Sequence, residues 1–207
     1  EANSRARTGL ITINRFGKIS EVKTPAIAIV GTRGAVKSIS IRDLKEAETQ
    51  IVLSNTYHLM EKAEIINTHG GLHEFMGWDG MIITDSGGFQ IFSLGVAKKH
   101  QVSKIGFFPG EKNVKRDERC KSKNLEITEE GVCFRSEKNG AKLFLSPEES
   151  MRIQELLNAD MIFAFDECTS PMASKQYTKL AMERTHRWAV RCLEAKKSDQ
   201  ALFGIIQ

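Results

Sequence analysis

Residues 81–90 read MIITDSGGFQ, a short apolar run followed by an acidic residue and a glycine pair. An unbroken apolar run of this kind is typical of a strand that is buried on both faces of a parallel sheet. Helical patterns separate it from several similar runs, so the sequence predicts an α/β fold with a parallel sheet. The other runs lie at residues 26–30, 51–53, 161–165 and 202–206.

The chain begins with a different pattern, which predicts an antiparallel β-hairpin. GLITINR (residues 9–15) and ISEVKTP (residues 19–25) nearly alternate apolar and polar residues around Phe16 and Gly17. We therefore expect a hairpin that precedes the parallel sheet.

Start signals indicate where three helices lie. Residues 40–48 begin with Ser40, a suitable N-cap, and residues 146–158 begin with a serine, a proline and, at the third helical position, a glutamate. A longer helix is predicted over residues 175–197. The apolar residues expected near one face of this helix are Leu180, Trp188 and Leu193.

The composition, 41% hydrophobic and 27% charged, is that of an ordinary soluble protein. No apolar run approaches the ~18 residues of a membrane helix, and the polar opening lacks a secretory signal, so we expect a cytoplasmic protein with no membrane partner. The cysteines form no metal-ligand motif, which predicts reduced thiols and no metal site in this chain. They are Cys120, Cys133, Cys168 and Cys192.

The net charge of +4 is unevenly distributed along the 207 residues. Residues 95–124 hold nine lysines and arginines against three acidic residues, so the rest of the chain is slightly acidic. This basic segment shows little periodicity, and an irregular stretch of this length predicts a surface insertion, which we place at residues 95–127.

Polar residues follow three of the apolar runs where the strands should end: Asp85, Asp166 and Gln207. The carboxyl ends of parallel strands meet at one edge, so we expect two carboxylates and an amide to share a site. These groups suit the edge of a heterocycle, because carboxylates accept from N–H donors and an amide both donates and accepts. Gly87 and Gly88 would admit a flat ligand close to the backbone.

An aromatic face for such a ligand would come from Phe89, with Tyr57 or Phe165 as further candidates. Each of these features has a plainer alternative. An aspartate after a strand is often the N-cap of the next helix, and for Asp85 or Asp166 taken singly that interpretation is at least as good. A glycine pair is more often a turn than a ligand cradle.

Other residues are better interpreted as structural. His69 and His73 are four apart, but two glycines between them disfavour a metal-binding helix. Cys168 lacks a local basic partner, which predicts a buried thiol rather than a nucleophile. We place Trp78 and Trp188 in the core.

Taken together, these segments resemble the amino-terminal half of a bacterial-type tRNA-guanine transglycosylase, also called queuine tRNA-ribosyltransferase. The motifs occur in the family's order and spacing over nearly the whole chain. They are LSNTYHL (53–59), GGLHEFMGWDG (70–80), ITDSGGFQIFSL (83–94), EEGVCFRS (129–136), LSPEES (145–150), FDEC (165–168) and LFGIIQ (202–207).

The resemblance implies a TIM (β/α)8 barrel with an inserted amino-terminal sheet and a zinc-binding subdomain. It implies a pentosyltransferase of queuosine biosynthesis, which exchanges guanine at the wobble position of tRNA for a 7-deazaguanine, preQ1 in bacteria. The exchange passes through a covalent enzyme–RNA intermediate, much as retaining glycosidases pair a nucleophile with an acid/base.

The resemblance also assigns roles by motif. Asp85 would be the general acid/base, Asp166 would contact the N–H edge of the purine, and Gln207 would bind its carbonyl side. The remaining base-pocket residues would be Ser86, Gly87, Gly88 and Phe89.

Five apolar runs fall short of the eight strands and ~250 residues of a typical barrel. We therefore expect residues 1–207 to be the amino-terminal part of one barrel domain, with the nucleophile and the structural zinc ligands downstream. A gene product split into two chains is the alternative. The expected partners are tRNA, the incoming base and, for the full-length protein, a second copy in a homodimer.

Two other functions remain open at this point. One is a non-catalytic homologue that binds tRNA or a partner subunit, although the retained Asp85 and Asp166 disfavour it. The other is the archaeal-type enzyme, which acts at another tRNA position and which the FDEC and FGIIQ motifs disfavour. The basic insertion either contacts tRNA phosphates or is a solvated loop.

Overall fold

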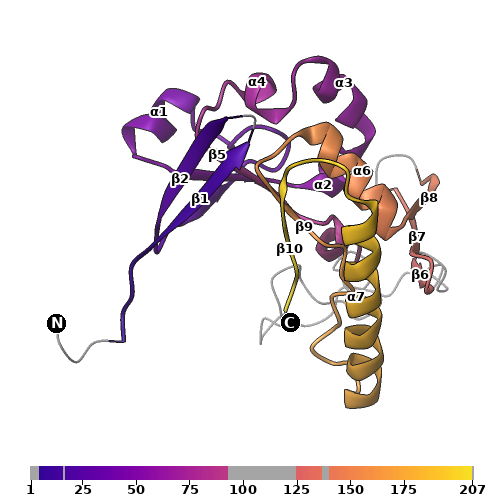
Figure 1. The fold of residues 1–207 in the computed structure, drawn as a ribbon. Coiled ribbons are helices and arrows are strands. Elements are labelled where there is room, and N and C mark those ends of the chain that lie inside the picture. Colours follow the sequence, from indigo (N-terminus) through magenta and orange to yellow (C-terminus); the bar gives the residue numbers. More distant parts are fainter. Residues whose placement is uncertain (1–4, 16, 93–124, 137–139, 207) are drawn as a thin grey trace, which may run out of the picture.

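The computed structural model describes residues 5–15, 17–92, 125–136 and 140–206 (Figure 1). Gln207, Cys120 and residues 95–124 of the predicted insertion lie outside the described residues. The last three residues of that insertion form strand β6 (Leu125–Ile127).

A parallel sheet of five strands forms the centre of the fold, which confirms the prediction of an α/β protein. Its strands follow one another in chain order across the sheet, and every neighbouring pair is parallel. The strands are β3 (Ala28–Val30), β4 (Ile51–Ser54), β5 (Met81–Thr84), β9 (Met161–Phe163) and β10 (Ala201–Phe203).

Helices connect these strands, and two of them begin at the predicted caps. The Ser40 side chain accepts from the Asp43 backbone N–H at the start of α1 (Ile41–Glu46). Ser146 accepts in the same way at the start of α6 (Pro147–Leu157). The other helices are α2 (Thr56–Leu59), the short 3-10 helix η1 (Met60–Lys62), α3 (Ala63–Thr68), α4 (Leu72–Met76) and α7 (Lys175–Ala195).

Helix α7 forms where it was predicted, but its buried face is not the predicted one. Leu180 and Leu193 are 51% and 65% exposed, whereas Trp188 is fully buried. The residues that pack inward recur every three or four positions and include small and polar side chains that an apolar pattern does not find. They are Ala181, Thr185, Trp188 and Cys192.

The two faces of the parallel sheet are covered by different elements. Val52, Ile82 and Ile162 belong to the larger core with the helices. Their strand neighbours Ile51, Met81 and Met161 point the other way. There they pack with Ile13 and Val22 of the predicted hairpin, strands β1 (Gly9–Arg15) and β2 (Lys18–Thr24).

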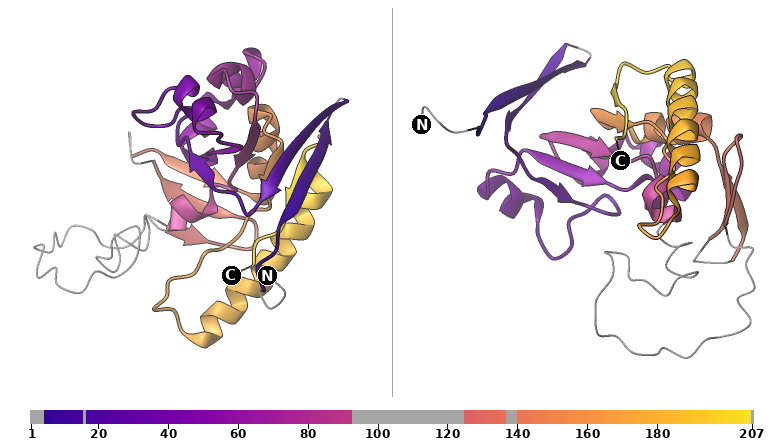
Figure 2. Two further views of the ribbon diagram at one scale, coloured as in Figure 1. Left: turned by 90° about the vertical axis from the view of Figure 1, so that its left-hand side faces the viewer. Right: turned by 90° about the horizontal axis from the view of Figure 1, so that it is seen from below.

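A second antiparallel sheet was not predicted. It contains β6, β7 (Val132–Arg135) and β8 (Lys142–Leu145), in chain order between β5 and α6. Figures 1 and 2 show this sheet and the β1–β2 hairpin at opposite sides of the molecule. Among the described residues, no helix has the length and apolarity to cross a membrane.

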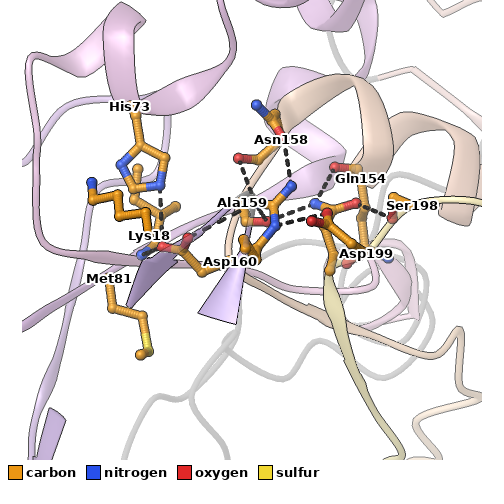
Figure 3. A network of polar contacts seen from close by, with 12 residues as sticks. Lys18, His73, Met81, Gln154, Asn158, Ala159, Asp160, Ser198 and Asp199 are labelled. Atoms are coloured by element: carbon orange, nitrogen blue, oxygen red, sulfur yellow. Dashed lines mark hydrogen bonds and ion pairs between the residues drawn. The ribbon is translucent and has the colours of Figure 1, made fainter. Parts of the chain in front are cut away.

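The hairpin is fastened to the amino ends of the parallel strands by one buried arginine, Arg15, which is 8% exposed. Its guanidinium donates to the Ala159 carbonyl at 2.8 Å, to Asn158 Oδ1 at 2.7 Å and to Asp199 Oδ1 at 3.0 Å. Figure 3 labels these three partners. Arg15 thus joins β1 to the segments that precede β9 and β10.

Asp160, just before β9, lies next to this arginine, and the two side chains are 3.8 Å apart. Its carboxylate accepts from the Ile82 backbone N–H at 2.8 Å and lies 3.1 Å from Nε2 of His73 (Figure 3). Nδ1 of the same imidazole is 2.8 Å from the Trp78 carbonyl. Both ring nitrogens of His73 therefore face acceptors, an arrangement that the doubly protonated imidazolium satisfies.

Candidate active site at the carboxyl ends of the strands

Asp85 and Asp166 follow β5 and β9, and the structure brings their segments together at the carboxyl edge of the sheet. Ser86 makes the connection, since its hydroxyl donates to Asp166 Oδ1 at 2.8 Å. The same hydroxyl oxygen accepts from the Gly88 backbone N–H at 3.1 Å. Ser86 and Asp166 are only 4% and 5% exposed, so this contact is buried.

The Asp85 carboxylate is held by neutral donors on both of its oxygens. Oδ1 accepts from the backbone N–H groups of Thr56 and Gly87, at 2.8 and 3.2 Å. Oδ2 accepts from the side-chain amides of Gln90, at 2.8 Å, and Asn55. No salt bridge to Asp85 is formed within the part of the chain that the structure describes.

Asp85 does cap a helix, as the alternative interpretation proposed, but the helix is α2 and not the one that follows Asp85 in the chain. Thr56 is the first residue of α2, whose N-cap residue Asn55 makes no capping bond with its own side chain. Asp85 supplies the carboxylate there, reaching across from the neighbouring strand. The start of α2 therefore fixes the direction of the Asp85 side chain.

The two glycines are needed for different reasons. Gly87 has φ +82, a conformation that favours glycine and suits a turn. A Cβ on Gly88 would lie 2.7 Å from the Asp166 carbonyl oxygen and 3.1 Å from Asp166 Oδ1. Gly88 therefore allows the backbone after β5 to approach the Asp166 segment.

Two polar residues that the sequence analysis missed support this edge from α6. Gln154 bonds both the N–H and the carbonyl of Phe163, at 3.0 and 2.9 Å, and accepts from the Thr84 hydroxyl. Ser150 donates to the Ser86 carbonyl at 2.7 Å. β5 and β9 pair only at Ile83 and Met161, so Gln154 bridges the strands where direct pairing has ended.

A signal for these two residues exists in the sequence. Ser150 and Gln154 are one helical turn apart and fully buried, on the same side of α6 as Met151 and Leu157. A polar pair at i and i+4 among the apolar positions of a helix indicates buried hydrogen bonds.

The aromatic candidates differ in their positions. Phe89 is 50% exposed beside the glycine pair. Phe165 is fully buried and stacks on Trp188 with ring centroids 5.0 Å apart, so it does not offer a face to a ligand. Tyr57 packs against Phe134 of β7 at 5.8 Å. Trp78, like Trp188, lies in the core as predicted.

Cys168 and Cys192 behave as structural thiols. Burial, followed by the charge of Asp166, raises the pKa of Cys168. Burial also raises the pKa of Cys192 to about 11, and its sulfur accepts from the Phe165 N–H at 3.2 Å. A raised pKa keeps the thiol protonated and so disfavours a nucleophile. Across residues 5–15, 17–92, 125–136 and 140–206, no three His, Cys, Asp or Glu side chains gather in a way that fits a metal ion.

A singly wound parallel sheet with carboxylates at its carboxyl edge defines a class of α/β proteins whose sites are built from the loops after the strands. The particular family follows from sequence comparison. Residues 2–207 match the family described as Queuine tRNA-ribosyltransferase, and the chain belongs to this family.

Individual relatives carry the same description. A putative queuine tRNA-ribosyltransferase of Archaeoglobus fulgidus is 44% identical over 204 residues, which cover 93% of this chain and 51% of the relative. The queuine tRNA-ribosyltransferase of Staphylococcus aureus strain JH9, like that of strain N315, is 48% identical over 189 residues, which cover 89% of this chain and 43% of the relative. The chain thus spans about half the length of these curated relatives.

Proposed function

We propose that this chain carries the base-binding part of a tRNA-guanine transglycosylase, which exchanges guanine at the wobble position of tRNA for a 7-deazaguanine such as preQ1. The observation that supports the proposal is the pair of strand ends, Asp85–Ser86 and Asp166, joined by the buried 2.8 Å hydrogen bond from Ser86 to Asp166. Guanine presents N–H donors on one edge, and buried carboxylate oxygens are the acceptors that such an edge requires.

Asp85 is proposed as the general acid/base. When the bond between ribose and guanine breaks, the leaving purine nitrogen needs a proton, and the incoming base must lose one before it bonds to the ribose. One carboxyl group that first donates and then accepts keeps this exchange balanced. Its neutral donors Asn55, Thr56, Gly87 and Gln90 orient the carboxylate without neutralising its charge.

Asp166 is proposed to accept from the N–H edge of the bound purine, and Phe89 to supply an exposed aromatic face over it. Gln207 is proposed for the carbonyl side of the base. The covalent ribosyl intermediate requires a nucleophile, a role that we do not propose for Asp85, Asp166 or Gln207.

The parallel sheet is proposed as five consecutive strands of a TIM barrel, with the hairpin packed on its interior face. The chain order of the strands and their parallel pairing support this proposal. We further propose a cytoplasmic protein that forms homodimers at full length and contains a structural zinc bound by residues outside the described part of the chain.

The proposal is tested by incorporation of labelled guanine into tRNA by the full-length protein. Incorporation is expected into a tRNA with a queuosine-type anticodon and not into the same tRNA with adenine at the wobble position. Tight tRNA binding without incorporation would contradict the enzyme and favour a non-catalytic tRNA-binding homologue.

The basic segment, residues 95–124, is proposed to contact tRNA phosphates. Changing four of its lysines to glutamate should weaken tRNA binding. It should also make the slope of log affinity against log salt concentration less steep. On the scale known for duplex DNA, the slope should change by about 0.9 for each phosphate that is no longer neutralised. An unchanged slope would reject this role and indicate a solvated loop.

A further inference from the structure

Glu167 is a buried acidic residue that the proposed chemistry does not use, although it directly follows Asp166. Its side chain is 1% exposed. An ionised carboxylate at such a position is costly unless it is paired and hydrogen-bonded. Its partners therefore indicate what the residue is for.

Within the described residues, the partners of Glu167 come from α7. The Tyr177 hydroxyl donates to Oε1 at 2.5 Å, and the Arg184 guanidinium pairs with Oε2. The Thr185 hydroxyl oxygen accepts from the Glu167 backbone N–H at 3.0 Å. Burial, followed by the hydrogen bond to Glu167, raises the pKa of Tyr177 to about 12, so the tyrosine remains a donor at neutral pH.

The segment that carries Asp166 depends on these contacts for its position. β9 ends at Phe163, and the Ala164 N–H still bonds to the Phe203 carbonyl of β10 at 2.9 Å. Beyond this point, the backbone N–H groups of Phe165 and Glu167 bond to side chains of α7. Where pairing with β10 ends, side chains of α7 therefore become the hydrogen-bond partners of this backbone segment.

Side chains along this segment alternate in direction. Phe165 stacks on Trp188 of α7, Asp166 turns to Ser86 at the carboxyl edge, and Glu167 turns back to α7. Because the outer two residues are fixed to the helix, the backbone between them is fixed on both sides. A change at Glu167 would rotate or release the peptide that carries the Asp166 carboxylate.

We infer that Glu167 is a positioning residue, whose contacts with Tyr177 and Arg184 aim Asp166 at the amino-bearing edge of the purine and thereby set discrimination against purines without that amino group. The inference rests on the proposed function. A site built to accept from a particular N–H group discriminates strongly against an analogue that lacks the group, but only while the acceptor is held in place.

The test compares guanine with hypoxanthine, which lacks the 2-amino group, in the full-length protein. Glu167→Gln is expected to raise the KM for guanine about tenfold, the order of effect of a small misplacement, while the inhibition constant of hypoxanthine changes less than about twofold. The selectivity for guanine therefore falls, and kcat per folded molecule changes less than KM.

Two further variants make the result decisive. Tyr177→Phe retains the Glu167–Arg184 ion pair and should shift selectivity in the same direction by a smaller factor, which decides the question if Glu167→Gln does not fold. Glu148→Gln breaks another ion pair with α7, to Arg191 at 2.7 Å, and should leave selectivity unchanged.

A purely structural role for Glu167 predicts lower stability and lower kcat with the guanine-to-hypoxanthine ratio unchanged, and that result would overturn the inference. Absence of exchange by the wild-type protein would instead contradict the proposed function. The two failures are therefore distinguishable.

Discussion

Asp160 and Asp85 lie at opposite ends of the parallel sheet and are held by different kinds of partner. At the amino end, Asp160 faces the imidazole of His73 and the guanidinium of Arg15. At the carboxyl end, Asp85 accepts from backbone and side-chain amides. Both carboxylates are fixed, but among the described residues cationic groups compensate the charge of Asp160 and not that of Asp85.

We interpret this difference as the separation of a structural end of the molecule from the end that carries the proposed site. Cationic partners compensate a buried carboxylate, and the resulting network joins the hairpin to the sheet. Neutral donors fix the direction of a carboxylate and leave its charge available to a proton or a ligand. In barrel folds the amino-terminal face is likewise associated with stability and the carboxyl-terminal face with catalysis.

The largest effect is expected at the amino end, from Arg15→Met. The substitution removes the donor to Ala159 and Asn158 and leaves Asp160 with less compensation, so the free energy of unfolding should fall by about 3 kcal/mol. Urea unfolding measures this change. Exchange activity per folded molecule should stay near the wild-type value.

Arg42→Met serves as the control for Arg15→Met, because Arg42 is 82% exposed in its pair with Glu46. Its unfolding free energy should change by less than about 0.5 kcal/mol. If Arg15→Met lost exchange activity while remaining as stable as the wild type, the assignment of stability to the amino end and of exchange to the carboxyl end would be wrong.

A smaller effect is expected at the carboxyl end, from Gly88→Ala. The new methyl group would meet the Asp166 carbonyl oxygen at 2.7 Å, which a backbone atom can relieve only by moving. The kcat/KM for guanine should fall about tenfold. Gly204→Ala, whose added Cβ would meet nothing within 4 Å, is the matched control. Equal activity of the two alanine variants would show that close approach at Gly88 is not required.

The smallest effect is the pH dependence of the amino-end network. Burial opposes the charged imidazole, but the hydrogen bond and charge of Asp160, with the Trp78 carbonyl, outweigh it and raise the pKa of His73 above 6.5. The stabilisation is therefore complete below pH 6.5 and is lost as the pH rises through the raised value. Between pH 5.5 and 9, the wild type should therefore lose more unfolding free energy than His73→Gln.

His69→Gln provides the comparison for His73→Gln, because the His69 imidazole is exposed and contacts the Ile65 carbonyl rather than a carboxylate. Its unfolding curve should follow the wild-type pH dependence. A wild type whose stability rises from pH 6.5 to 9 relative to His73→Gln would contradict the charged form of His73.

The parallel sheet and the helix starts could be predicted because their signals are local. Continuous apolar runs mark the parallel strands, and the cap residues Ser40 and Ser146 stand directly before their helices. The antiparallel sheet gave no such signal, since β7 and β8 mix buried with exposed positions.

The site could be predicted only in part, for the same reason. Asp85 and Asp166 follow apolar runs, and the geometry of parallel strands places such residues at one edge. The amino-end network acts across the chain: Arg15 bonds to Asp199, which is 184 positions away. Contacts at that separation leave no pattern in a single sequence, and neither does the burial of Thr185 on α7.

Guanine exchange and urea unfolding, measured in parallel for Asp85→Asn and Asp160→Asn, test the separation of the two ends most directly. Asp85→Asn should lose at least about 100-fold in exchange rate, the order of a general acid/base, while the protein remains folded. Asp160→Asn should lose about 1–3 kcal/mol of stability and retain exchange per folded molecule. Full exchange by Asp85→Asn, or loss of exchange by a stable Asp160→Asn, would contradict the assignment of function to the carboxyl end.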